Sequence, residues 1–171
     1  MKKKLLIFIS LLISLNLLSQ PTVKVFAFEQ ENLPGTKAVG VTDENGNPVK
    51  RAAIKKDYFI YLSFNKTYNI VPVDVFIDGK PFRIQSAKIK KAPVYYVNKN
   101  IPSNAQRITL VPATANKIIS LQVGEVAAGN VSSNVQKIIA KNDVVIGYLW
   151  KNKKYFTTVK EIKPLEPVAN E

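Results

Sequence analysis

The clearest signal in the chain is the run of apolar and β-branched residues on either side of Asp78-Gly79. Residues Ile70–Ile77 before this pair and residues Lys80–Gln85 after it are both rich in side chains that favour strands. An Asp-Gly pair between two such runs favours a two-residue hairpin turn, because both central residues of a type I′ turn need a positive φ. The stretch therefore predicts a β-hairpin.

The alternation within this hairpin predicts which side chains of its first strand are buried. Every second residue of a strand points to the same side, and we expect the core side to hold Val71, Val73, Val75 and Ile77. Pro72 has no N–H group to give to a neighbouring strand, so it predicts a sheet edge or a bulge where this strand begins.

Two other stretches carry patterns that are as clear. Residues Tyr58–Phe64 are apolar on both alternating faces, which predicts a central strand that is covered on both sides. Residues Val144–Trp150 and Lys154–Ile162 flank Lys151-Asn152 and predict a second hairpin. The two hairpins resemble each other, either through an internal duplication or because basic hairpins look alike.

The rest of the chain consists of shorter segments. Further strands are expected at residues 21–28, 36–42, 49–55, 93–97, 107–111 and 117–123. Loops are expected at 29–35 and 127–134, and a turn is expected at 43–48. Residues 136–140 fit either a helix turn or a strand, and residues 164–171 are expected to be a frayed tail. About ten short strands separated by turns predict an all-β fold. We expect residues 20–163 to form a single antiparallel β-sandwich of the Ig-like or Greek-key type, with a closed β-barrel as the alternative.

The first 19 residues have the pattern of a secretory signal peptide. Lys2–Lys4 form a positive start, and residues 5–18 are mostly apolar. This run is shorter than the roughly 20 apolar residues that a membrane-spanning helix needs, so no transmembrane helix is expected. Cleavage is expected after Ser19, which leaves Gln20 as the first residue, and cleavage after Ala27 is the alternative. The chain is thus predicted to be exported to the periplasm or beyond.

Composition limits the chemistry that the chain can perform. It contains no cysteine and no histidine. Without cysteine there is no disulfide, thiolate nucleophile or Cys-ligated metal, and without histidine the commonest general base and metal ligand is missing. The carboxylates are scattered, and no pair has the placement that glycoside hydrolysis requires. We therefore expect no catalytic residue, no cofactor and no metal site.

The chain is also strongly basic, with 25 Lys and Arg against 12 Asp and Glu, a net charge of +13. Without the three lysines of the predicted signal peptide, the balance is 22 against 12, or +10. Such an excess favours anionic partners through long-range attraction. The alternative is that scattered lysines keep a β-rich surface soluble and protect its edge strands.

The second hairpin is the candidate binding site, because aromatic and basic side chains alternate along it. The candidate residues are Tyr148, Trp150, Lys151, Lys153, Lys154 and Tyr155. The expected function is a non-catalytic binding or structural module of the cell envelope, with an anionic glycan, a lipid or another protein as partner and no nucleic acid. Alternatives are a barrel that carries a small apolar ligand and a carboxylate-based enzyme that acts on glycans. Aromatic residues at alternating positions also suit a core.

Two resemblances accompany these patterns. The N-terminal run ending in Leu-Leu-Ser-Gln20, together with Phe76–Phe82 and Leu110–Lys117, resembles small exported proteins of Bacteroidota-type bacteria. This resemblance implies export and a β-rich body and implies no activity. Residues 43–49 are similar to the strand-turn-strand of carboxypeptidase-regulatory-like sandwich domains.

Overall fold

The computed structural model describes residues 20–34, 45, 54–98, 107–128 and 131–169. The predicted signal peptide, the strand expected at 36–42, the turn at 43–48 and most of the strand expected at 49–55 lie outside these residues. Among the described residues, the fold is all-β and mainly antiparallel, as predicted. Its strands are β1 (Val23–Leu33), β2 (Lys55–Phe64), β3 (Val71–Ile77), β4 (Lys80–Lys90), β5 (Val94–Tyr96), β6 (Ile108–Val111), β7 (Lys117–Val126), β8 (Val144–Trp150), β9 (Lys153–Val159), β10 (Lys163–Pro164) and β11 (Val168–Ala169).

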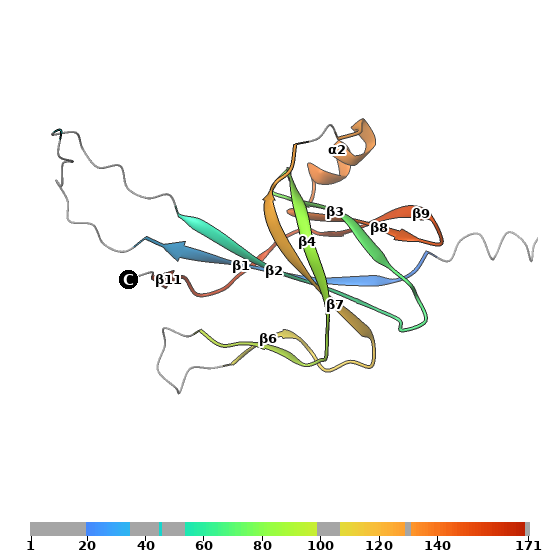
Figure 1. Cartoon of the computed structure of the whole chain (residues 1–171), viewed down its shortest axis with the longest axis horizontal. Helices are drawn as coiled ribbons and strands as arrows, with labels where there is room; N and C mark the ends of the chain where they lie inside the picture. Colours follow the sequence, from blue (N-terminus) through green and yellow to red (C-terminus); the bar gives the residue numbers. More distant parts are fainter. Residues whose placement is uncertain (1–19, 35–44, 46–53, 99–106, 129–130, 170–171) are drawn as a thin grey trace, which may run out of the picture.

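Most of these strands belong to one curled sheet. Its nine strands follow the order β10-β1-β2-β7-β4-β3-β8-β9, and β11 also pairs with β1. The sheet curls into a half-barrel, so that β9 approaches β1 and Thr157 donates a hydrogen bond of 3.2 Å to the carbonyl of Val23 (Figure 1). The second sheet holds only β5 and β6. The architecture thus lies between the predicted sandwich and the closed barrel that was its alternative.

β2 is the central strand that the sequence predicted, since it pairs with β1 on one side and β7 on the other. Its inner side chains Ile60, Leu62 and Phe64 lie at the heart of the half-barrel and are buried. This inner cluster also takes apolar side chains from β3, β7 and β8. A protein without disulfides depends on burial of this kind for its stability.

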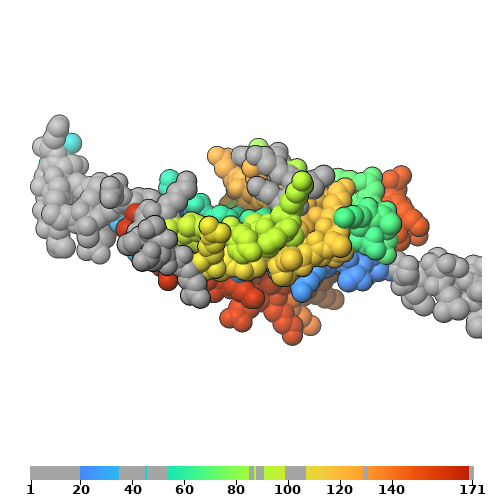
Figure 2. All heavy atoms as spheres, turned by 90° about the horizontal axis from the view of Figure 1, so that it is seen from below, coloured from blue at the N-terminus to red at the C-terminus, as the bar shows by residue number. Residues whose placement is uncertain are grey.

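The outer face of β2 is covered by two segments that are distant in sequence. Tyr61 packs there in a second cluster with Leu110 and Val111 of β6 and with Leu165 near the C-terminus. The buried Gln30 of β1 donates hydrogen bonds to the Tyr96 hydroxyl and to the carbonyl of Glu166. Figure 2 views the molecule from this side and shows the yellow-green and yellow residues of β5, β6 and the start of β7 across the middle of the face.

Both predicted hairpins are present and share one turn geometry. Asp78 and Gly79 have φ of 48° and 79°, and Lys151 and Asn152 have φ of 48° and 59°. Positive φ at both central residues is what a type I′ turn requires. β3 and β8 pair antiparallel, so the two hairpins lie side by side in the sheet.

The expected burial of β3 holds for half of the strand only. The pairing with β8 shifts between Pro72 and Asp74, so of the sheet edge and the bulge that Pro72 predicted, the structure has the bulge. Val75 and Ile77 are buried as expected, but Val71 and Val73 are exposed. The extra residue of a bulge breaks the alternation of faces, and this places Val71 on the outer side of the sheet.

Both ends of the folded chain are more regular than predicted. β1 continues through the loop expected at 29–35 as far as Leu33, because its ladder with β2 runs to Asn32. The segment expected to be a frayed tail returns to β1 instead, where β10 and β11 pair with it in parallel. The Leu165 amide donates a 2.7 Å hydrogen bond to the carbonyl of Glu29, and the Leu165 side chain is buried.

The segment that the sequence left open between helix and strand is helical. α2 (Ser133–Ile139) lies beside the turn at Asp78-Gly79 (Figure 1). Within the described part of the chain, no helix is both long enough and apolar enough to cross a bilayer.

The position of β1 leads to a test of where the chain can be shortened. A chain that begins at Gln20 keeps every described contact and should unfold cooperatively in urea. A chain that begins at Phe28 loses the pairs from Val23–Phe64 to Ala27–Ile60, and it should be unfolded by circular dichroism. A cooperative transition of the shorter chain with unchanged stability would contradict this account of β1.

Burial of Tyr61 predicts a loss of stability at alkaline pH. Desolvation raises the pKa of Tyr61 above the ordinary value near 10. The folded state therefore holds the phenol proton more tightly than the unfolded state, and this stabilisation is complete below about pH 10 and is lost as the pH rises through the folded pKa. The free energy of unfolding in urea should fall less between pH 8 and pH 11 for Tyr61→Phe than for the wild type. Tyr95→Phe at an exposed site is the control, and equal losses in all three proteins would contradict the prediction.

Candidate binding surface at the tip of the second hairpin

Three segments that are distant in sequence meet at one end of the half-barrel. They are the first described residues from Gln20, the loop at 65–70 and the turn between β8 and β9. Tyr68 of the loop contacts Trp150 edge-on, with ring centroids 5.7 Å apart. Figures 1 and 2 both show the loop in green beside the orange-red tip of the hairpin.

The aromatic residues of the hairpin have unequal access to solvent. Tyr148 is 1% exposed and belongs to the inner core, so it has no free surface for a partner. Its hydroxyl donates to the carbonyl of Pro21 at 3.3 Å and accepts from the Gln20 amide at 3.4 Å. Burial raises the pKa of Tyr148, a change that the Gln20 hydrogen bond opposes and the neighbouring Tyr155 reinforces. Tyr148 thus ties the start of the described chain to this end of the barrel.

Trp150 lies nearer the tip and is half-buried. Its ring centroid is 6.0 Å from that of Tyr155, and the Lys151 ammonium lies 4.7 Å from the ring centroid. A cation at this distance is attracted to the face of the ring. The aromatic part of the site is therefore fixed by packing and covered in part by a positive charge.

The outer face of the same hairpin presents an apolar row beside lysines. Val71 of β3 is paired with Leu149 of β8, which is paired with Lys154 of β9. Val71 is 48% exposed and Leu149 is 36% exposed. We call the exposed set around this end the tip surface. Val71, Leu149 and Lys154 lie on its outer face, the half-buried Trp150 and its partner Lys153 lie on the inner face, and Lys151 lies in the turn.

One acidic side chain adjoins the tip surface. The Asp74 carboxylate lies across Gly147, where its Oδ2 is 2.5 Å from Lys154 Nζ. Among the described residues this buried oxygen has no hydrogen-bond donor with suitable geometry, and the close ammonium nonetheless neutralises it as an ion pair. Lys151 and Lys153 are exposed and have no ion pair among the described residues.

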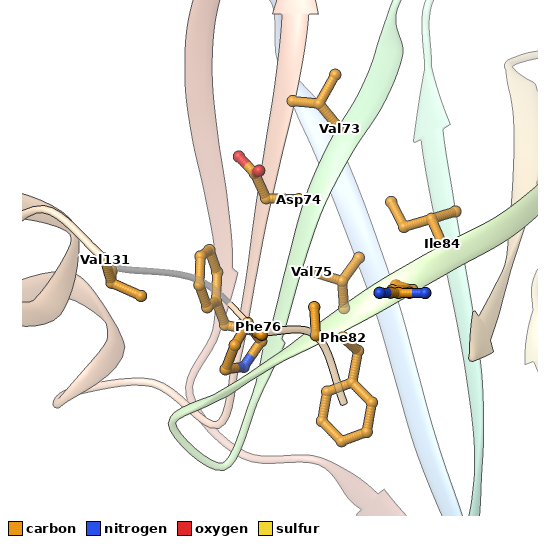
Figure 3. Close-up of a pocket in the computed structure, with 11 residues that line it drawn as sticks. Val73, Asp74, Val75, Phe76, Phe82, Ile84 and Val131 are labelled. Carbon is orange, nitrogen blue, oxygen red and sulfur yellow. The ribbon is translucent and has the colours of Figure 1, made fainter. Parts of the chain in front are cut away.

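A hollow of about 430 Å³ lies beside the bulge and is lined by residues of β3, β4 and the segment 127–131. Ladder pairing between β3 and β4 ends at Val75–Phe82, and the hollow opens where the two strands separate. Figure 3 shows Val73 and Asp74 on one side of it and Phe76 and Val131 on another. Its lining is mainly apolar, with Asp74 and Arg83 as the charged members.

The other charged contacts have the geometry of surface pairs. Lys56 lies 3.0 Å from Glu29 and 3.9 Å from Glu31, and exposed pairs of this kind add little stability. The hydrogen bond to Glu29 is the main reason that the pKa of Lys56 is raised. Within the described chain, no three acidic side chains come together as metal ligands.

The structure brings five of the six predicted residues to one end of the molecule as accessible groups and places the sixth, Tyr148, in the core. Partner binding by this hairpin stays a prediction. The sequence patterns did not point to Val71, Tyr68 or Asp74 as neighbours of the hairpin, since all three arrive from β3 or the loop before it. The sequence did contain a pattern that places Tyr148 in the core, because Tyr148 continues the buried alternation of Val144 and Ile146.

No family model, curated protein or solved structure matches this chain.

The Asp74–Lys154 pair predicts that Gly147 cannot be enlarged without cost. A Cβ at position 147 would lie 2.5 Å from Asp74 Oδ2 and 3.2 Å from the ring of Phe156. Gly147→Ala should therefore destabilise the fold by about 1–3 kcal/mol in urea unfolding, the usual cost of overpacking. The same change in an Asp74→Ala background should cost less, because the clashing carboxylate is gone. Equal costs in both backgrounds would contradict this packing.

Proposed function

We propose that this protein is an exported, non-catalytic module that binds an anionic partner of the cell envelope through the tip surface. The observation that carries the proposal is the concentration of Lys151, Lys153 and Lys154 around a packed aromatic cluster at one end of the barrel. Among the described residues, Asp74 forms an ion pair with Lys154 of this group. The charges of Lys151 and Lys153 are thus available to an incoming anion.

Export is supported by the way in which the fold begins. The predicted signal peptide ends directly before Gln20, whose side chain already hydrogen-bonds to the fold. Cleavage after Ala27 would remove part of β1 and the contacts it makes with β2. Removal of a leader before Gln20 is therefore the processing that preserves the barrel.

The arrangement of side chains favours binding over the two alternatives. A carrier of apolar ligands would use the hollow beside β3 and β4, but that hollow is open to the outside and shares Asp74 with the ion pair. A glycan-acting enzyme would need two acidic side chains facing each other across a cleft, and Asp74 is the single acid in the lining of the hollow.

Retention on immobilised heparin, a sulfated glycan, tests the proposal. The chain from Gln20 should bind in 50 mM NaCl and elute as the salt concentration rises, because exposed charges are screened. Lys151→Gln with Lys153→Gln should elute at clearly lower salt. The matched control is Lys55→Gln with Lys137→Gln, which removes the same charge from exposed positions elsewhere and should elute close to the wild type.

Two results would overturn the proposal. One is the absence of retention at low salt. The other is equal earlier elution of both double variants, which would show that net charge alone is responsible. Lys154 is left in place in these variants because its loss would strand the Asp74 carboxylate.

A further inference from the structure

We infer that the tip surface docks on an anionic lipid bilayer, an inference that rests on the proposed function and specifies its partner. This basic surface contains two exposed aliphatic residues. Val71 and Leu149 are paired across β3 and β8 and are both exposed, so that they form a continuous aliphatic patch directly beside Lys154. A partner that offers only negative charge has no use for them.

Their position next to the lysines matches the layers of a membrane interface. Lys154 is paired directly with Leu149, and the exposed Lys151 and Lys153 flank the turn. Lysines near an anionic surface each add to binding, with a contribution of roughly fivefold per residue. Aliphatic side chains beside them gain by entering the apolar layer under the headgroups.

The aromatic side chains at this end point to the same partner. Trp150 and Tyr155 are half-buried on the inner face beside the turn, opposite the face that carries Val71 and Leu149, and Tyr68 from the neighbouring loop completes the group. Tryptophan and tyrosine are enriched at the level of lipid headgroups, because their rings have an apolar body and a polar edge. A bilayer that meets the end of the hairpin edge-on contacts both faces, and it therefore accounts for the lysines, the aliphatic pair and the aromatic group together.

A soluble acidic glycan is the other anionic partner to consider. It would be bound by the lysines as well, but it would leave Val71 and Leu149 in water. The two partners therefore differ in what happens to the aliphatic pair and to Trp150, the single tryptophan of the chain. That tryptophan gives a fluorescence signal that reports the tip alone.

The test uses the chain from Gln20, which contains every described residue of the fold, and vesicles of equal parts phosphatidylglycerol and phosphatidylcholine. We expect co-sedimentation with these vesicles, at least tenfold weaker binding to pure phosphatidylcholine, and quenching of Trp150 by lipids brominated along the acyl chain. Val71→Thr with Leu149→Thr keeps strand-forming residues and every charge, and it should weaken binding by at least tenfold and abolish the quenching.

The matched control is Val97→Thr with Leu33→Thr, which removes a valine and a leucine of similar exposure from other parts of the surface. It should bind vesicles like the wild type. Equal loss in the two double variants, or binding without quenching and without any effect of Val71→Thr and Leu149→Thr, would overturn the inference.

Heparin retention separates this inference from the proposed function. Retention on heparin without binding to anionic vesicles would overturn docking on lipid and leave the proposed function standing. Failure to bind either heparin or vesicles would overturn both.

Discussion

The structure depends above all on the need to cover both faces of β2. This strand carries large apolar side chains on each side, and the chain has no disulfide to help hold it. The inner face is covered when the sheet curls around Ile60, Leu62 and Phe64. The outer face is covered by β5, β6 and the segment around Leu165. The half-barrel and the small second sheet therefore have the same physical cause, because each removes one apolar face of β2 from water.

Local patterns were enough to predict much of this architecture. The all-β class, the central strand and both hairpins followed from alternation and from turn residues that tolerate positive φ. What the patterns missed depends on pairing between distant segments. Residues 163–169 look like a tail because they contain two prolines. They form strands because they pair with the edge of β1 that β2 leaves free. The bulge at Pro72 was foreseen, but its effect on the burial of Val71 was not.

The candidate site was located by the same reasoning and described only in part. The basic turn at Lys151-Asn152 is a local feature and was found. Tyr148 was counted with the surface, because β8 is apolar on both sides and its sequence does not show which side is inner. Asp74, which sets the charge beside the turn, comes from β3, and no sequence pattern linked it to Lys154. Strand neighbours of this kind are set by sheet order, which sequence alone does not give.

The return of the C-terminal segment to β1 also bears on when folding can finish. β1 is among the first parts of the barrel to be synthesised, and the partners on its outer edge are the last. Chains whose contacts join such distant segments pay a large loop entropy before the contacts form, and they fold slowly. The nascent polypeptide therefore lacks the strands that cover the outer edge of β1 until residues 163–169 have been synthesised. Up to that point the backbone donors and acceptors along this edge are open to pairing with another chain.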